Sequence, residues 1–312
     1  MSPAFFFMRI GIVSGSGICI PLLYHLKASG EEVELYFGDV PYTDKDRDAV
    51  PIFCSSHQVK LTRETQRNQL YDWLETFKPD VVFVSGYSHK IDVKRCRELK
   101  HGIYNIHFGK LPGYRGPNPV FWQLKNGDAS IGMCIHELTR RFDAGPIVWQ
   151  QELNNEPHFS YTWVTQVFSN LQVQGVQFLL SQFRQGRPVD KQAQDEKKAG
   201  YQKRPLLNDV LIQWQKMKPE NILHLVKACN SWNYGAMTAF SGMEVKILDA
   251  TISDLPADGK APGTVIRTGN YLTVTCSENK SIDIGFLSIN GVLLPARHSV
   301  YFSLTPGQRF TT

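Results

Sequence analysis

Short apolar runs and amphipathic stretches alternate along the first half of the chain. Apolar runs bounded by turn residues predict buried strands at 8–13, 33–37, 81–84 and 103–106. Apolar residues at helical spacing predict helices at 20–26 and 70–77, between these strands. This order is typical of a doubly wound, mainly parallel sheet. Residues 38–62 are polar, and we expect a long loop there around the short run 51–54.

The pattern changes in the second half of the chain. Runs at 131–138 and 147–153 predict further strands, and 160–183 predicts one long amphipathic helix. Beyond it, a helix is predicted at 222–229, and short strands at 245–252, 263–266, 272–276 and 282–287. Strands at about ten-residue spacing indicate a small β-barrel or sandwich. We therefore expect a domain at 1–184, a Gln-, Lys- and Asp-rich linker at 185–205, and a second domain at 206–312.

Composition restricts the class of protein. With 42% apolar and 20% charged residues, the chain is neither a disordered protein nor a fibrous one. No apolar run approaches the roughly 20 residues of a membrane helix. The smallest gap between any two of the six cysteines is 35 residues, so no zinc-binding pair is present, and we expect no metal site. With no leader sequence, reduced thiols in a cytoplasm are the simplest expectation.

The net charge of +5 is unevenly distributed along the chain. Residues 1–183 are neutral overall, whereas residues 184–204 carry a net charge of +4. A nucleic-acid-binding protein would more often show a broad basic face. This distribution favours a solvated basic linker beside a neutral first domain.

Residues 105–145 contain the candidate chemistry. Asn105 and His107 are two apart at a strand end, so their side chains share a face where open α/β sheets bind ligands. A rigid loop rich in Pro and Gly follows, and Asp143 precedes an Ala-Gly turn. Each residue alone could be structural, because Asn and Asp are common in turns. Together, an amide, an imidazole and a carboxylate can move an acyl group to a neutral amine.

A second, glycine-containing motif is less informative. Gly15-x-Gly17 could indicate dinucleotide binding, but the third glycine of that fingerprint is absent. We interpret it as a tight turn before a helix.

These residues closely resemble the 10-formyltetrahydrofolate-dependent formyltransferase family. The shared pattern is Asn-x-His, then Leu-Pro-x-Tyr-Arg-Gly-x-x-Pro at 111–119, then Asp-x-Gly starting 24 residues later. Ile212-x-Trp214 and Pro262-Gly263-Thr264-Val265 resemble the second domain of members that act on methionyl-tRNA. The resemblance implies a Rossmann-like catalytic domain, an OB-like C-terminal barrel and 10-formyltetrahydrofolate as formyl donor.

The resemblance also implies roles for individual residues. Asn105, His107 and Asp143 match the family's catalytic positions. Asn105 and a protonated His107 would stabilise the developing oxyanion. Asp143 would hold the imidazole charged or help to remove the amine proton, since a carboxylate raises the pKa of a nearby histidine.

The donor pocket is expected between the third predicted strand and the Pro-rich loop. Family members bind the pterin there largely through backbone groups, although Tyr87 could equally be a packing residue. The expected pocket residues are Ser85, Gly86, Tyr87, Leu111, Pro112, Tyr114, Arg115 and Gly116.

Two positions depart from the family pattern. Gly109 stands where Ser is usual, and Cys134 stands where Thr is common. Neither change removes a catalytic group, but we expect them to reshape the acceptor side.

The acceptor amine is the open question. Family members formylate methionyl-tRNA, nucleotide-linked amino sugars or other small amines. The members that act on tRNA usually carry a basic loop after the second strand, whereas residues 38–48 hold four Asp against one Lys and one Arg. A net charge of −2 would repel RNA phosphates. We therefore favour a small-molecule amine, such as an amino sugar nucleotide or an amino-acid-derived amine.

Three alternatives remain open. One is methionyl-tRNA as acceptor, supported by the basic linker beside an OB-like domain. A formyltetrahydrofolate hydrolase and an inactive binding module are the others. The sequence does not indicate an oligomeric state.

Overall fold

The computed structural model describes residues 7–38, 44–66 and 68–312, and the chain divides into two compact units. The first comprises residues up to 119, 132–152 and 165–201, and the second comprises residues 120–131, 153–164 and 202–312. In the described part, no helix is long and apolar enough to cross a membrane.

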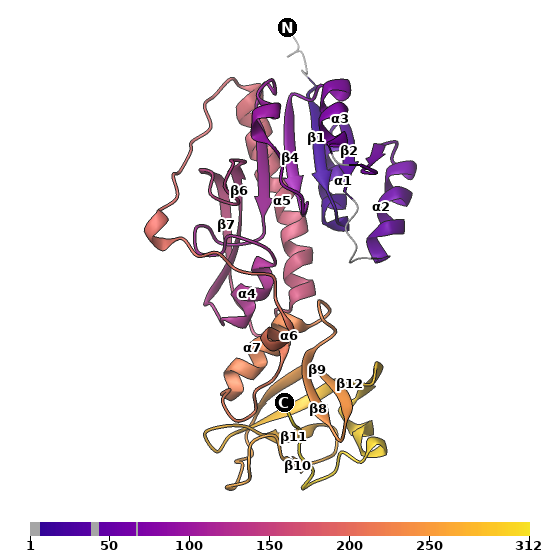
Figure 1. Ribbon diagram of the computed structural model, residues 1–312, viewed down its shortest axis with the longest axis vertical. Helices are drawn as coiled ribbons and strands as arrows, with labels where there is room; N and C mark the ends of the chain where they lie inside the picture. The colour runs from indigo at the N-terminus through magenta and orange to yellow at the C-terminus, as the bar shows by residue number, and fades with distance from the viewer. Residues whose placement is uncertain (1–6, 39–43, 67) are drawn as a thin grey trace. The chain divides into compact units, whose positions relative to one another are not determined.

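A seven-stranded sheet forms the centre of the first unit, in the order β3-β2-β1-β4-β5-β6-β7 (Figure 1). Its strands are β1 (Arg9–Ser14), β2 (Glu32–Phe37), β3 (Lys60–Arg63), β4 (Val81–Ser85), β5 (Ile103–His107), β6 (Ser130–Glu137) and β7 (Ile147–Asn154). Strands β1 to β5 pair in parallel, and β6 pairs antiparallel with β5. This arrangement confirms the expected mainly parallel α/β fold.

Helices cover both faces of this sheet. On one face, α3 (Gln69–Phe77) packs its Leu70, Trp73 and Phe77 against side chains of β1 and β4. Gly11 of β1 allows this approach, because a Cβ there would lie 2.9 Å from the Trp73 ring. On the other face lie α1 (Ile20–Ala28) and α5 (Tyr161–Arg184). Gln172 of α5 accepts a hydrogen bond from the Ser85 hydroxyl and donates to the Ile18 carbonyl oxygen.

The expected loop at 38–62 is wrong. The chain forms helix α2 (Asp44–Ser56) and the edge strand β3 there. Pro51 lies inside α2 and masks the helical pattern in the sequence, because proline normally ends a helix. Val50 and Cys54 are nevertheless buried one turn apart. The acidic stretch at 38–48 falls partly outside the described residues, which do not include 39–43.

The second unit contains a curled antiparallel sheet with the strand order β10-β11-β12-β9-β8, and β13 pairs with β12. These strands are β8 (Ala236–Phe240), β9 (Met243–Ser253), β10 (Val265–Arg267), β11 (Leu272–Thr275), β12 (Ser281–Ile289) and β13 (Val292–Pro295). The helices are α4 (Pro119–Lys125), most of which belongs to this unit, α6 (Leu207–Val210) and α7 (Pro219–Cys229). The sequence pattern predicts neither β8 nor β13, which are short strands.

The C-terminal segment closes this sheet into a barrel. Thr311 and Ala239 exchange two backbone hydrogen bonds, and the Phe310 N–H donates to the Gly263 carbonyl oxygen. The segment thus bridges the β8 edge and the chain just before β10. Phe310 is buried and stacks on Trp214, whose indole N–H donates to Thr238. The expected OB-like barrel is confirmed.

Candidate active site

Asn105 and His107 lie at the carboxyl end of β5, and the neighbouring strand determines what faces them. Strand β6 pairs with β5 so that His136 lies opposite Asn105 and Cys134 lies opposite His107. Opposed residues of an antiparallel pair share one face of the sheet. The four side chains therefore form one small patch at the point where β5 ends.

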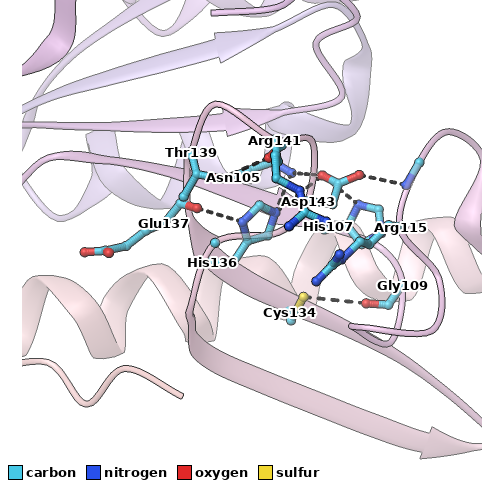
Figure 2. A network of polar contacts seen from close by, with 12 residues as sticks. Asn105, His107, Gly109, Arg115, Cys134, His136, Glu137, Thr139, Arg141 and Asp143 are labelled. Atoms are coloured by element: carbon cyan, nitrogen blue, oxygen red, sulfur yellow. Dashed lines mark hydrogen bonds and ion pairs between the residues drawn. The ribbon is translucent and has the colours of Figure 1, made fainter. Parts of the chain in front are cut away.

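Asp143 completes this patch (Figure 2). Its Oδ1 accepts a hydrogen bond from Asn105 Nδ2 at 3.2 Å and lies 3.7 Å from His107 Nδ1. Its Oδ2 accepts the backbone N–H of Gly116 at 2.8 Å. Asn105, His107 and Asp143 thus converge, as the sequence predicts.

Backbone geometry explains why residue 145, two positions after Asp143, is glycine. Asp143 has a left-handed φ of +50°, which is unusual for a residue other than glycine. A Cβ on Gly145 would lie 1.8 Å from the Glu137 carbonyl oxygen, so no other residue fits there. This close approach brings the Asp143 carboxylate back over the end of β5.

The amide of Asn105 is fixed by two acceptors. One Nδ2 hydrogen goes to Asp143 and the other to His136 Nε2, at 3.1 Å. This contact assigns the neutral Nδ1–H tautomer to His136, whose Nδ1–H donates to the Glu137 carbonyl oxygen at 2.9 Å. The His136 side chain is 1% exposed and also lies 3.4 Å from Asp143 Oδ1.

The environment of His107 differs from the one we expected. Its Nε2–H donates to the Tyr114 carbonyl oxygen at 2.6 Å. Burial lowers the pKa of His107, and the nearby Asp143 carboxylate, which raises it, does not outweigh burial. The net direction is opposite to the expected one, because the side chain is only 7% exposed.

Asp143 is held as a carboxylate. Burial alone would raise the pKa of Asp143, but His107, His136 and the Gly116 N–H outweigh this effect. Together they hold the pKa well below its usual range. Asp143 is thus ionised across the physiological pH range.

Four of the predicted pocket residues lie in the loop that follows His107. Pro112 follows a cis peptide bond, and Leu111 packs in a small cluster with Cys134 and Ile147. Tyr114 and Gly116 contact His107 and Asp143 through their backbone groups. Their assignment to a donor pocket stays a prediction.

Of the remaining predicted pocket residues, three use their side chains in hydrogen bonds within the protein, and the fourth is a glycine. Ser85 is buried against α5, and the Tyr87 hydroxyl donates to Glu64 at 2.8 Å. Gly86 has a positive φ of +69°. The guanidinium of Arg115 is buried and binds Gln194 and Glu196. The assignment of these four residues to a donor pocket also stays a prediction.

Sequence reasoning missed two residues of this network, His136 and Gln194. Gln194 Nε2 donates to the Asp143 carbonyl oxygen at 2.8 Å and to that of Gly145 at 2.7 Å. The sequence shows that His136 alternates with Cys134 on a strand that follows the Asn-x-His strand, but only the register of the two strands places it opposite Asn105. No comparable signal marks Gln194, which lies in a polar linker.

A hollow of about 540 Å³ lies within the first unit, lined by the residues that immediately precede Asp143 in the chain. Arg140, Arg141, Phe142, Glu196 and Tyr201 line it with exposed side chains, together with the buried Arg115. Hydrogen bonds from Arg115 and Arg141 lower the pKa of Glu196 to about 2. With three arginines against one carboxylate, the hollow is suited to an anionic ligand.

The donors and acceptors of this network suit a formyl carbonyl and an amine. They comprise a carboxamide, an imidazole, backbone N–H groups and an ionised carboxylate. In the described ranges, no group of three His, Cys, Asp or Glu side chains is placed to hold a metal ion.

Comparisons with known proteins agree with this chemistry. The sequence profile described as "Formyl transferase" matches residues 40–177, and "Formyl transferase, C-terminal domain" matches 207–292. The methionyl-tRNA formyltransferase of Thermotoga maritima is 26% identical over 275 residues, covering 85% of this chain and 84% of that protein. The one of Thermotoga neapolitana is 30% identical over 199 residues, covering 64% and 62%.

Solved structures with this fold differ more in sequence. HypX from Aquifex aeolicus, in complex with tetrahydrofolic acid, superposes with a TM-score of 0.68 at 18% identity. That match covers 95% of this chain but only 47% of HypX, so the chain spans about half of that protein. An N-formyltransferase from Helicobacter canadensis, in complex with folinic acid and dTDP-3-aminofucose, gives 0.68 at 14% identity, covering 89% and 99%.

Proposed function

Because the chain belongs to the formyl transferase family, in both its catalytic and its C-terminal domain, we propose that it formylates the primary amine of a small molecule. The chain is an enzyme that transfers a formyl group, with 10-formyltetrahydrofolate as the donor. The observation that carries the proposal is the convergence of Asn105, His107 and Asp143 in one buried network.

The donor supplies, when bound, a formyl carbon that an amine can attack. Attack would form the bond between the amine nitrogen and the formyl carbon and place negative charge on the formyl oxygen. The bond from the formyl carbon to the donor nitrogen would then break, and tetrahydrofolate would leave with a proton on that nitrogen. The Asn105 N–H that points to His136 is suited to stabilise the charge on the formyl oxygen, because an anionic oxygen is a stronger acceptor than a neutral imidazole nitrogen. Removing one such donor typically costs roughly 10²–10³ in rate.

The attacking amine must lose a proton, and His107 is the better acceptor for it. The pKa of Asp143 lies so low that its carboxylate is a poor base at neutral pH. His107 is neutral at rest, and both of its ring nitrogens face oxygen atoms, those of Tyr114 and Asp143. A proton arriving on Nδ1 therefore meets a carboxylate. Asp143 stabilises the resulting imidazolium, much as a carboxylate supports histidine in other acyl-transfer sites.

Two observations support a small, anionic acceptor such as an amino sugar nucleotide. Residues 1–183 carry no net charge, and 38–48 are acidic, so a large polyanion gains little attraction there. The hollow offers Arg140 to a phosphate, beside an Arg141 that is bound to Glu196, and Phe142 and Tyr201 to an aromatic base.

Methionyl-tRNA is the second candidate acceptor. It is favoured by the Thermotoga relatives, which match over most of this chain and are named methionyl-tRNA formyltransferases. The net charge of +4 on residues 184–204 points the same way.

An acceptor screen tests the proposal. Formyl transfer from 10-formyltetrahydrofolate is measured to nucleotide-linked amino sugars, amino-acid-derived amines and methionyl-tRNA, with parent enzyme and His107→Ala. We expect turnover of a small amine that His107→Ala abolishes while the circular dichroism spectrum is unchanged. Robust turnover of methionyl-tRNA alone would replace the small-molecule proposal, and near-normal turnover by His107→Ala would refute the role of His107.

A further inference from the structure

The linker is not simply a solvated connection between the two units. Residues 192–201, here called the linker segment, belong by their contacts to the first unit. At one end, Gln192 and Ile147 exchange two backbone hydrogen bonds of 2.8 Å. At the other, the Arg115 N–H donates to the Gly200 carbonyl oxygen and the Gly200 N–H donates to that of Pro112. The segment is thus fixed on both sides of the Asp143 loop.

Gln194 lies between these two anchors, and its carboxamide is fully used. Its two N–H groups donate to the carbonyl oxygens of Asp143 and Gly145. Its Oε1 accepts from Arg115 Nε at 3.0 Å and from Arg115 Nη2 at 2.8 Å. The same Arg115 side chain, which is 5% exposed, also binds Glu196.

These contacts hold a backbone that would otherwise be free to relax. Asp143 has a left-handed φ, a conformation that persists in a non-glycine residue only where neighbours enforce it. Gln194 binds the carbonyl groups on both sides of residue 144, so it fixes the orientation of this turn. The orientation of this turn determines where the Asp143 carboxylate lies relative to His107.

We propose that Gln194 is a positioning residue for formyl transfer, acting through the Asp143–Gly145 backbone and through Arg115. The expected loss of kcat rests on the proposed function, whereas the ordering of the Asp143–Gly145 turn by Gln194 does not. The linker segment then helps to shape the catalytic site, although the sequence pattern assigns its residues to a connection between domains.

Three variants of the full chain test the proposal. Gln194→Ala removes all four hydrogen bonds. Gln194→Glu keeps the acceptor for Arg115 but replaces both donors, so its carboxylate faces two carbonyl oxygens. Gln192→Ala is the matched control, because the described contacts of Gln192 are made by its backbone and its side chain is exposed.

We expect Gln194→Ala and Gln194→Glu to lower kcat by about 10- to 100-fold, since small misplacements of catalytic groups cost about this much. The KM for 10-formyltetrahydrofolate should stay within about twofold, and Gln192→Ala should resemble the parent. Parent-like kcat in Gln194→Ala would overturn the proposal. Parent-like kcat in Gln194→Glu would overturn the role of the two carbonyl contacts and leave Arg115 alone responsible.

Hydrogen–deuterium exchange separates this inference from the proposed function. In Gln194→Ala, but not in Gln192→Ala, amides of residues 143–147 should exchange faster than in the parent. Unchanged exchange would show that Gln194 does not order the loop. If the parent formylates none of the screened amines, the proposed function fails, whereas the exchange result still decides the structural role of Gln194.

Discussion

Gly109 leaves no room for a side chain next to His107, the proposed base. A Cβ there would lie 2.6 Å from Pro119 Cβ and 2.9 Å from His107 Nε2. Its carbonyl oxygen accepts the Cys134 thiol at 3.6 Å, so the two departures from the family pattern contact each other. In this chain glycine is therefore the residue that lets the His107 ring reach the Tyr114 carbonyl oxygen.

Replacing this glycine should displace the imidazole. We expect Gly109→Ser to lower kcat by about 10²-fold, because the ring must move away from the added side chain. Steady-state formyl transfer measures the effect. The control is Gly269→Ser, since Gly269 has open space around it and an ordinary φ. If Gly109→Ser and Gly269→Ser turn over equally fast, the site tolerates a side chain at 109 and the steric argument fails.

As the proposed base, the buried His107 should determine the pH dependence of the reaction. Because burial lowers the pKa of His107, the neutral ring persists below pH 6.5, the ordinary value. A neutral base loses activity only when pH falls through its pKa, so the acidic limb of kcat/KM, which reports the free enzyme, should lie below pH 6.5. A pH–rate profile between 4.5 and 8.5 checks this. Activity that falls as pH rises above 7 would show instead that the imidazolium is the working form.

At the same scale, the sequence predicts the three converging residues but not the residues that support them. Asn105, His107 and Asp143 follow from a motif with fixed spacing. His136 needs the register of β6 against β5, which no spacing within one strand reveals. Gln194 approaches Asp143 through a contact 51 residues apart in the sequence. Such contacts depend on the tertiary fold rather than on local pattern.

At the scale of elements, continuous apolar runs are the most reliable sequence signal for the buried strands. Strand β4 is buried along its whole length and reads as a continuous apolar run. Helix α2 is missed because Pro51 interrupts a polar stretch, and β3 because a half-exposed edge strand needs few apolar residues. Strand β8 is short, and its residues include two alanines, which carry little strand signal.

Closure of the barrel by the C-terminal segment gives a prediction about stability. Phe310 is 2% exposed and stacks on Trp214, so Phe310→Ala should lower the free energy of unfolding by about 3–5 kcal/mol. Tyr301→Ala, at a side chain that is 85% exposed, should change it by less than about 0.5 kcal/mol. Urea unfolding followed by tryptophan fluorescence measures both. Equal stability of the two variants would mean that the terminal segment does not hold the barrel together.

At the scale of the whole molecule, the distribution of charge matters more than its sum. The excess positive charge lies mostly in residues 184–204, and part of it pairs locally. Lys191 contacts Glu137, Lys198 pairs with Asp195, and Lys203 contacts Asp209. The net charge of +5 is thus weak support for a nucleic-acid partner.

Salt dependence distinguishes the two classes of acceptor. A small acceptor with about two phosphates should lose at most about tenfold in kcat/KM between 50 and 200 mM salt, because few counterions are released. A tRNA contacted at 6–10 phosphates would lose roughly 10³–10⁵ over the same range. Measuring kcat/KM for each accepted amine at several salt concentrations checks this. A steep loss for the preferred acceptor would contradict a small-molecule substrate.

The linker segment also sets a practical limit on how this enzyme can be recombined with its relatives. A chimaera joined at residue 184 would take Gln194, Glu196 and Gly200 from the other parent, together with their contacts to Asp143, Arg115 and Pro112. With a junction placed after Tyr201, both residues of each contact come from the same parent. Exchange of C-terminal domains should therefore use the later junction.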